Sequence, residues 1–402
     1  MEHAHQVLIV GGGLVGASLA IALDRAGIET ALVEATAPGV MPDVFDQRNL
    51  SFADATVNAL TTLGVLQKLQ AAPGPIRQIH ISRTGDFGRV RLDARDYGRH
   101  QFGQVVVARD FGDALEARLT EMTHLTRYRP ARVTAIEPAA GGRRVVHVAT
   151  PEGDQRIGAA LVVAADGTGS LVRERLGIEA ALHDYRQTLF VARLRTARAP
   201  EGIAYERLTD DGPTALLPRG DRHFGLVHGV ADADADAVAA LDDAGFLARV
   251  QAVFGWRAGR FDSVGARSRY PLRRVVAART TAERAVLVGN AAQTLHPIGA
   301  QGFNLGLRDA LTLAECIAGA PDPGAAEVLE TYAGRRREDR TRTLAFSDGL
   351  ARLTANPSPL LRPLRSVGLL AIDRDSALQA MLAGGAMGYR GDVPALCRGG
   401  AA

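Results

Sequence analysis

Apolar residues occur in short runs separated by polar turns, and the first runs form a strand–helix–strand pattern. Gln6 to Val10 is an apolar run that predicts a buried parallel strand. Ala17 to Arg25 carries apolar groups at helical spacing, and Gly27 follows as a stop signal. A second apolar run, Glu29 to Val33, ends at Glu34. The chain therefore opens with a βαβ-type unit.

A glycine-rich turn fills the junction between the first strand and the helix. Gly11, Gly13 and Gly16 supply the spacing GxGxxG. The first glycine permits a tight turn, the second lets the backbone approach a pyrophosphate, and the third lets the helix pack on the strand. Glu34 lies 18 residues beyond Gly16, where its carboxylate can accept hydrogen bonds from ribose hydroxyls. These features predict a dinucleotide site in a Rossmann-like α/β domain.

Two later apolar runs also end in loops with candidate binding residues. Leu161 to Ala165 predicts a strand that leads into Asp166 and Gly167. Ala285 to Val288 predicts a strand, and a loop rich in glycine and proline follows before a helix that carries Asp309. A strand, such a loop and a helix form a layout that binds anions. Between these runs, alternating segments predict an antiparallel sheet, at Thr188 to Leu194, Thr214 to Leu217 and His223 to Val230.

Composition narrows the class of protein. With 402 residues we expect two interlocked domains, and 47% hydrophobic with 23% charged residues is ordinary for a globular enzyme. The net charge of +3 and the interspersed acids argue against a nucleic-acid partner. Two cysteines are too few for a cysteine-ligated cluster, and we expect no metal site. We interpret the alternating aspartates from Asp232 to Asp236 as a solvated loop or helix start.

The three motifs together resemble the para-hydroxybenzoate-hydroxylase type of FAD monooxygenase. The late block GNAAQTLHP, followed by GQGFNLG-type residues and Asp309, is similar to the ubiquinone-biosynthesis (UbiH-type) hydroxylases. The resemblance implies a Rossmann-like FAD-binding domain with an inserted antiparallel-sheet substrate domain and a helical C-terminal tail. The implied boundaries are 1–75 with 101–181 and 279–345 for the FAD domain, 76–100 with 182–278 for the substrate domain, and 346–402 for the tail.

The resemblance also implies roles for individual residues. The adenosine and pyrophosphate half of FAD would contact the GxGxxG glycines and Glu34, and Asp166 with Gly167 would touch both FAD and the nicotinamide. The flavin half would lie near Arg48, Gln104, Arg109, Asn290, Pro297, Gly302, Phe303 and Asn304. The family usually has A-G-Q-G where this chain has Gly299, Ala300, Gln301 and Gly302, and we expect a local backbone adjustment there.

The activity implied by the resemblance is hydroxylation of a polyprenylated phenol with NAD(P)H and O2. NAD(P)H would reduce FAD and leave, O2 would add to the reduced flavin, and one oxygen atom would pass to the ring. Residues 205–213 and 254–257 resemble the enzyme that acts on 2-polyprenyl-6-methoxyphenol. Two alternatives remain: an FAD-dependent prenyl-chain reductase, and a non-catalytic flavin-binding subunit of a ubiquinone-biosynthesis assembly. The pattern leaves open whether other ubiquinone-biosynthesis proteins are partners.

Several candidates favour a structural interpretation. His296 precedes Pro297 in the flavin loop and could act as a base, but a histidine bonded to backbone is favoured. The charged run from Arg335 to Arg340 is interpreted as a solvated helix face. The leucine-rich tail from Asn356 to Met381 favours a helix over the FAD domain, with contact to a membrane surface as the alternative. No apolar run spans a bilayer and no secretory signal opens the chain, so we expect a cytoplasmic protein, peripheral on the inner face of the cell membrane in that alternative.

Overall fold

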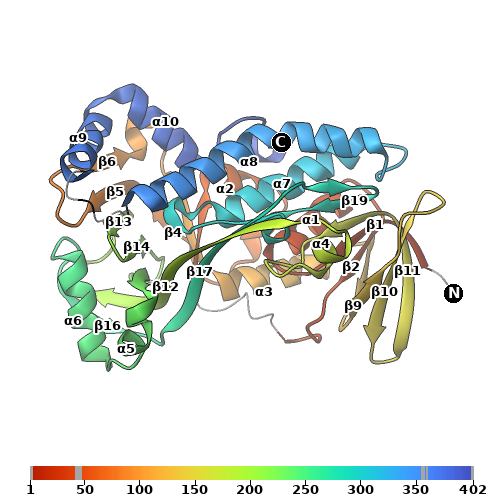
Figure 1. The fold of residues 1–402 in the computed structure, drawn as a ribbon, viewed down its shortest axis with the longest axis horizontal. Coiled ribbons are helices and arrows are strands. Elements are labelled where there is room, and N and C mark those ends of the chain that lie inside the picture. Colours follow the sequence, from red (N-terminus) through yellow and green to blue (C-terminus); the bar gives the residue numbers. More distant parts are fainter. Residues whose placement is uncertain (1–2, 41–47, 355–357, 359–360, 400–402) are drawn as a thin grey trace.

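The computed structural model describes residues 3–40, 48–354, 358 and 361–399. Within these residues the chain forms three β-sheets flanked by helices (Figure 1). In the first sheet the order β18-β19-β11-β1-β2-β8 brings together strands from three separate parts of the chain. Its strands are β1 (His3–Val10), β2 (Thr30–Val33), β8 (Leu125–Tyr128), β9 (Arg132–Ile136), β10 (Arg144–Thr150), β11 (Gly153–Ala164), β18 (Thr281–Ala282) and β19 (Ala285–Leu287).

The central strands of this sheet are parallel and buried on both faces. Val7 and Ile9 of β1 face one core, and Leu8 and Val10 face another, because alternate side chains of a strand point to opposite sides. The first core is covered by α1 (Leu14–Arg25), α2 (Asp54–Thr62), α3 (Ala108–Leu119), α7 (Gln301–Ile317) and α8 (Ala326–Thr354). The second is covered by β9, β10 and α4 (Leu171–Arg175). The predicted apolar runs therefore form the buried strands expected of them.

The second sheet is mainly antiparallel and has the order β20-β17-β12-β15-β14-β13-β5-β6, with β16 paired to β12. One of its faces packs on α6 (Asp243–Phe254) around Phe190, Phe224 and Phe246. Its strands are β5 (Gln78–Arg83), β6 (Arg89–Asp93), β12 (Ala180–Thr196), β13 (Ile203–Thr209), β14 (Gly212–Pro218), β15 (Phe224–Ala231), β16 (Phe261–Val264), β17 (Ser268–Ala277) and β20 (Gln293–Thr294). The three predicted alternating segments lie in β12, β14 and β15.

A small third sheet contacts β14 of the second sheet through its strand β4 and α7 through its strand β3. It consists of β3 (Asn49–Ala53), β7 (Gly103–Val107) and β4 (Gly74–Ile76), with β7 in the middle. Short helices join the elements: α5 (Ala235–Ala239) and the 3-10 turns η1 (Leu66–Lys68), η2 (Ala94–Tyr97), η3 (Asp232–Asp234), η4 (Gly289–Ala291) and η5 (Ile298–Ala300). The acidic run at 232–236 thus begins a helix, as expected, and its aspartates are exposed. No cluster of metal-ligating side chains occurs among the described residues.

The C-terminal helices differ from the favoured interpretation of the tail. Helices α9 (Leu361–Arg374) and α10 (Ser376–Met387) pack on β6 and its neighbours, where Leu369, Ile372 and Ala383 meet Val90 and Leu92. Only α11 (Ala395–Arg398) returns to the first domain, beside α2. The tail therefore covers the second sheet more than the first sheet and its helices, which form the region expected to bind FAD. Residues 355–357, 359 and 360 of the predicted tail lie outside the described residues, and the expected boundary at 345/346 falls inside α8.

The charged run at 335–340 was expected to be solvated, and the structure differs. Arg336 and Asp339 are buried, Arg340 is largely buried, and only Arg337 and Glu338 are exposed. The run is therefore not a solvated helix face. Tyr332, Arg336, Asp339, Thr343 and Ser347 form a buried stripe along α8. Their spacing of three or four residues is that of one helix face, and this was the available signal in the sequence.

Candidate active site

A large cavity lies between the first sheet, the second sheet and the C-terminal helices. Its volume is about 1210 Å³, more than the 300 to 1,000 Å³ that is common for a single small-molecule site. At one end the wall holds the glycine turn, Glu34 and Asp166, and at the other it holds β5, β13, β14 and α9. The predicted residues that line it are Gly11, Gly13, Glu34, Arg48, Asp166, Gly167, Asn290, His296, Pro297, Gly302, Phe303 and Asn304.

The glycine turn leaves no room for side chains at two of its positions. Gly11 has φ +103°, and a Cβ there would lie 2.5 Å from the carbonyl oxygen of Ala165. A Cβ on Gly16 would lie 1.9 Å from the carbonyl oxygen of Gly11. Gly16 does not line the cavity itself, so its role is the close packing of α1 on β1. Gly13 caps α1 and leaves the first N–H groups of that helix at the cavity wall.

Glu34 is held in place at the end of β2. Its Oε2 accepts a hydrogen bond from the backbone N–H of Gly12 at 2.8 Å, and its Oε1 accepts one from that of Thr36 at 2.7 Å. A carboxylate keeps further lone pairs when each oxygen accepts one bond. Glu34 can therefore accept additional hydrogen bonds from a ligand in the cavity.

Asp166 follows β11 and has two protein partners of its own. Its carboxylate accepts hydrogen bonds from Ser170 Oγ at 2.5 Å and from the backbone N–H of Val172 at 3.1 Å. Burial raises the pKa of Asp166, although these hydrogen bonds act in the opposite direction. Gly167 has φ +84° with open space around it, so the turn bends toward the cavity without steric hindrance.

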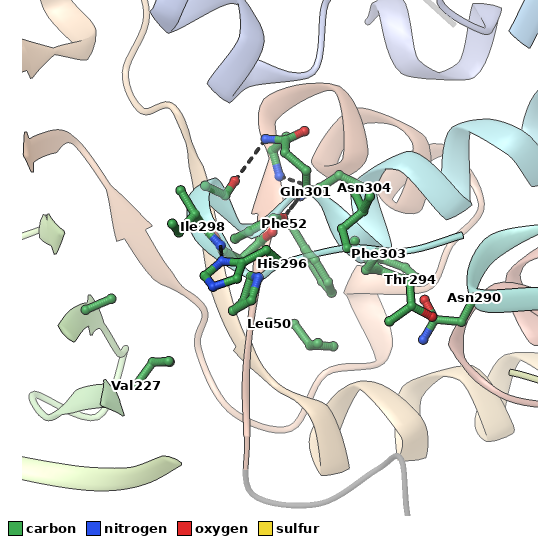
Figure 2. A pocket seen from close by; sticks show the side chains of 18 of the residues that line it. Leu50, Phe52, Val227, Asn290, Thr294, His296, Ile298, Gln301, Phe303 and Asn304 are labelled. Atoms are coloured by element: carbon green, nitrogen blue, oxygen red, sulfur yellow. Dashed lines mark hydrogen bonds between the residues drawn. The ribbon is translucent and has the colours of Figure 1, made fainter. Parts of the chain in front are cut away.

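The late loop brings the N-terminus of α7 to the cavity. Gly299 has φ +72° and Ala300 has φ +51°, so the expected backbone adjustment places an alanine in the left-handed region. The residues of the first turn of α7, Gln301 to Asn304, line the cavity (Figure 2), and their N–H groups lack intrahelical partners. An array of this kind stabilises negative charge on a ligand.

The Asn304 side chain fixes this helix start to the third sheet. Its Nδ2 donates to the carbonyl oxygens of Ser51 and Ala300, and its Oδ1 accepts from the N–H of Ala53 and the hydroxyl of Thr56. All four hydrogen bonds lie between 2.7 and 2.9 Å. Asn304 therefore positions the start of α7 through its side chain, in addition to presenting its backbone.

His296 has the structural environment that the sequence favoured. The N–H of Ile298 donates to its Nδ1 at 3.3 Å, so the ring proton belongs on Nε2, which faces Gln187 Oε1 at 3.4 Å. Burial lowers its pKa to about 4, which leaves the ring neutral at physiological pH. Tyr185 packs edge-on against the ring at 4.8 Å between centroids. His296 lines the cavity as a neutral, hydrogen-bonded residue.

Gln104 and Arg109 lie outside the cavity lining, as Gly16 does, whereas Arg48, Asn290 and Pro297 belong to it. Arg48 lines the cavity with its guanidinium stacked 4.4 Å from the ring centroid of Tyr270, and Asn290 and Pro297 also line it. Arg109 is exposed in the first turn of α3, outside the cavity lining. Gln104 lies on β7, also outside the lining, and within the described structure its buried Oε1 accepts no hydrogen bond.

A buried ion-pair network supports α7 from behind, and sequence reasoning missed it. Arg308 donates to Asp339 at 2.7 Å, and Arg336 donates to both Asp309 and Asp339 at 2.7 Å. Gln293 joins the network by donating to Asp309 at 2.6 Å. Burial alone would raise the pKa of Asp339, but the two arginines together lower it below its ordinary value. The network ties α8 to the helix whose N-terminus faces the cavity.

Comparison with known proteins identifies the family. Residues 4–347 match the family model described as FAD binding domain. The chain is 34% identical to the ubiquinone hydroxylase UbiL of Rhodospirillum rubrum over 387 residues, which cover 95% of this chain and 89% of the relative. The chain belongs to the ubiquinone hydroxylase family of FAD-dependent monooxygenases.

Further matches agree with this family. The 3-demethoxyubiquinol 3-hydroxylase of Escherichia coli is 29% identical, with 93% of this chain and 96% of the relative covered. The p-nitrophenol 4-monooxygenase PnpA of Pseudomonas putida has the same fold, with a TM-score of 0.77, 18% identity, and coverage of 97% and 99% of the two chains. The resemblance inferred from the motifs, the fold class and the FAD cofactor are thereby confirmed.

Proposed function

We propose that this ubiquinone hydroxylase converts 2-polyprenyl-6-methoxyphenol to the corresponding benzoquinol, with NAD(P)H and O2 as co-substrates. The observation that carries the proposal is the continuity of the cavity. It joins a glycine turn and two helix N-termini, which suit a dinucleotide, to an apolar chamber between the second sheet and the C-terminal helices. The volume of about 1210 Å³ leaves space for a prenylated ring beside the cofactor.

The residues present fit FAD. Gly11, which has no room for a Cβ, and Gly13 line the cavity at the N-terminus of α1, so a pyrophosphate can lie against that helix end, and Glu34 would bind the ribose. Arg48, Asp166, Gly167, Asn290 and Pro297 would contact the remainder of the cofactor, and the N–H groups of Gly302, Phe303 and Asn304 would face the flavin ring. Gln104 and Arg109 lie outside the cavity lining, so their effect on the cofactor would be indirect.

The chain would position the reactants and shield them from water. Bound FAD would take up electrons from NAD(P)H and activate O2. The N-terminus of α7 would stabilise negative charge at the cofactor edge. The apolar chamber excludes water and holds the ring in one orientation. Neutral His296 keeps the loop beside Pro297 in place and transfers no proton in this scheme.

The prenyl tail would leave the chamber at the C-terminal helices. Leu353 and Leu364 line the cavity and are also 47% and 66% exposed, so they form its mouth. Phe87 in the β5–β6 loop, Val367 on α9 and Met381 on α10, which packs on α9, are further large exposed apolar side chains. Among the described residues, none of the helices has the length and hydropathy to cross a membrane. We propose that this mouth contacts the inner face of the cell membrane as a peripheral surface.

An assay under 18O2 tests the proposed reaction. The purified protein is mixed with FAD, NADH plus NADPH, and a short-tailed 2-prenyl-6-methoxyphenol, and the product is analysed by mass spectrometry. We expect one labelled oxygen on the ring. A product that gains hydrogen on the tail and no oxygen would support a prenyl-chain reductase instead. A yellow protein whose NAD(P)H oxidation does not respond to the phenol would support the non-catalytic subunit.

A further inference from the structure

The cavity face of the second sheet carries one carboxylate in an otherwise apolar row. Glu206 lies in the middle of β13, opposite Ile81 of β5 and Ala215 of β14. Its neighbours on the same face of β13 are Ala204 and Leu208, because alternate residues of a strand share a face. Every side chain next to Glu206 along or across the strands on this face is therefore aliphatic.

No protein group uses the Glu206 carboxylate: within the described structure it has neither an ion pair nor a hydrogen bond. The charged groups lining the same chamber are engaged elsewhere. Arg83 and Arg365 both pair with Asp86, and Arg390 lies over the ring of Phe346. His296 is neutral. The other charged lining residues are Arg132, Arg48, which stacks on Tyr270, and Glu34 and Asp166, which lie by the glycine turn at the opposite end, the dinucleotide end of the cavity.

Burial in this apolar wall raises the pKa of Glu206 to about 7. An unpaired carboxylate in such a place costs free energy, so a site that retains one often uses it with a ligand. The described lining residues include no tyrosine, lysine or cysteine that could compete for the role. Tyr205 and Arg207, the neighbours in sequence, point to the opposite face, where Tyr205 packs on Phe254 and Arg207 donates to Ser82.

Glu206 lies between the two regions that a prenylated ring must contact. On one side, Leu208 and Ile81 pack in a cluster with Ile298, the residue that follows Pro297. On the other side, Ala204 packs with Leu369 and Ile372 of α9 near the mouth. Figure 2 shows Val227, which pairs with Ala215 in the next strand, on the sheet strands and apart from the loop residues around His296.

We infer that Glu206 binds the hydroxyl group of the phenolic substrate and accepts its proton during hydroxylation, an inference that rests on the proposed function. The O–H bond of the ring hydroxyl breaks, a new O–H bond forms on the carboxylate, and the negative charge moves to the ring oxygen. The ring carbons ortho and para to this oxygen gain electron density and react with the oxygen donor. The hydroxylated carbon then loses its C–H proton to water, the ring regains aromaticity, and Glu206 returns its proton to the ring oxygen.

The test compares Glu206→Gln with a matched control in the same hairpin. Asp211→Asn makes the same chemical change at the exposed β13–β14 turn, outside the cavity lining. For each protein, FAD content, NAD(P)H oxidation and labelled product under 18O2 are measured from pH 5.5 to 9. We expect Glu206→Gln to bind FAD normally and to lose hydroxylation by on the order of 100-fold, a typical contribution of a general base.

The pH profile and an altered substrate separate a proton acceptor from a structural residue. In the wild-type protein the hydroxylation rate should rise with pH through about 7, because only the ionised carboxylate accepts a proton, and Glu206→Gln should lack this limb. A fluorinated phenol, which ionises without help, should recover part of the lost rate in Glu206→Gln but gain little in the wild type. Glu206→Asp should retain the pH limb with a lower rate.

The outcomes distinguish this inference from the proposed function. If the wild-type protein forms no labelled product, the proposed function fails. If the wild type hydroxylates the phenol and Glu206→Gln keeps the same rate and pH limb, the role of Glu206 is overturned while the function stands. A variant that loses activity equally with the ordinary and the fluorinated phenol would also overturn it, since the loss would then be structural.

Discussion

The two ends of the cavity are built in opposite ways. At the dinucleotide end the contacts are short and made largely by backbone: a Cβ at Gly16 would lie 1.9 Å from a carbonyl oxygen, and Asn304 uses all four of its hydrogen-bonding positions. At the chamber end the wall is a broad aliphatic surface, and Glu206 is a carboxylate without a protein partner in the described structure.

This difference explains how each end discriminates between ligands. The dinucleotide end requires specific backbone geometry, so small steric changes should be costly there. If Glu206 binds the substrate hydroxyl as we infer, the chamber end would accept apolar groups of variable shape and discriminate through one polar contact, because an unsatisfied buried polar group is more costly than an imperfect apolar contact. Substitutions at the first end should therefore affect stability and cofactor binding, and those at the second should affect chemistry and membrane contact.

The largest loss of stability is expected from the network behind α7. Asp339→Ala leaves Arg308 and Arg336 without their shared buried carboxylate, and breaking such a pair costs about 3–5 kcal/mol. Denaturant unfolding should report this loss, together with a lower FAD content. Glu338→Ala, one residue away and exposed, is the control and should change stability by less than about 0.5 kcal/mol. Equal effects of the two substitutions would contradict the assignment.

Among substitutions that add one methyl group at the dinucleotide end, Gly16→Ala should reduce stability and FAD binding most. The added Cβ collides with the Gly11 carbonyl, so α1 must move away from β1, which costs about 1–3 kcal/mol and weakens FAD binding. Gly334→Ala is the control, because Gly334 lies in α8 with open space around it and should gain up to about 1 kcal/mol. Unfolding curves and the flavin absorbance of the purified variants measure both effects.

At the chamber end, Glu206 should make the free energy of unfolding of the protein depend on pH. Its pKa is about 7 in the folded protein and 4.5 as the ordinary value, so the folded state holds this proton more tightly. The stabilisation from this proton is complete below pH 4.5 and is lost as pH rises through about 7. Substrate-free Glu206→Gln should therefore gain about 1–3 kcal/mol over wild type at pH 8 and much less at pH 5. Parallel unfolding curves at the two pH values would show no such difference if the carboxylate had a protein partner.

A smaller gain is expected from Ala300→Gly. Ala300 has φ +51°, where a side chain is disfavoured, although glycine adds entropy to the unfolded chain. The two effects leave a net gain of less than about 1 kcal/mol, measurable as a higher thermal midpoint. A lower midpoint would show that the alanine methyl group makes contacts that outweigh the strain.

Substitutions at the mouth of the cavity should affect stability least. They should clearly weaken binding to lipid membranes. Leu364→Ser combined with Met381→Ser removes two exposed apolar side chains and should change stability by less than about 0.5 kcal/mol each. Sedimentation with anionic lipid vesicles should show weaker binding of this variant. Trp256→Ser provides the control, since Trp256 is equally exposed but lies between α6 and β16, away from the mouth. Binding lost only with Trp256→Ser would place the membrane contact elsewhere.

Local patterns predicted the elements that surround the glycine turn. The GxGxxG turn, the strand before Asp166 and the helix that carries Asp309 depend on neighbouring residues, so they could be read from the chain. The burial of Arg336 and Asp339 was missed because charged residues are usually solvated, although their helical spacing with Tyr332 pointed inward.

The chamber end could not be predicted in the same way. The row around Glu206 is assembled from β5, β13 and β14, and its lack of a partner depends on where Arg83 and Arg365 lie in space. The stretch from Tyr205 to Pro213 was singled out only by its resemblance to relatives. No strand was predicted over this stretch, so the sequence indicated neither which of its residues share a face nor which face borders the cavity.

The strand order of the first sheet has a consequence for protein synthesis. β1 pairs with β11, β11 pairs with β19, and α7 packs against α1, so the first and last parts of this domain meet only when residues up to 317 are available. A nascent chain still lacking this third segment has no complete cofactor wall. We therefore expect flavin to be loaded after translation of nearly the whole chain, and the rate of folding to be limited by these distant pairings.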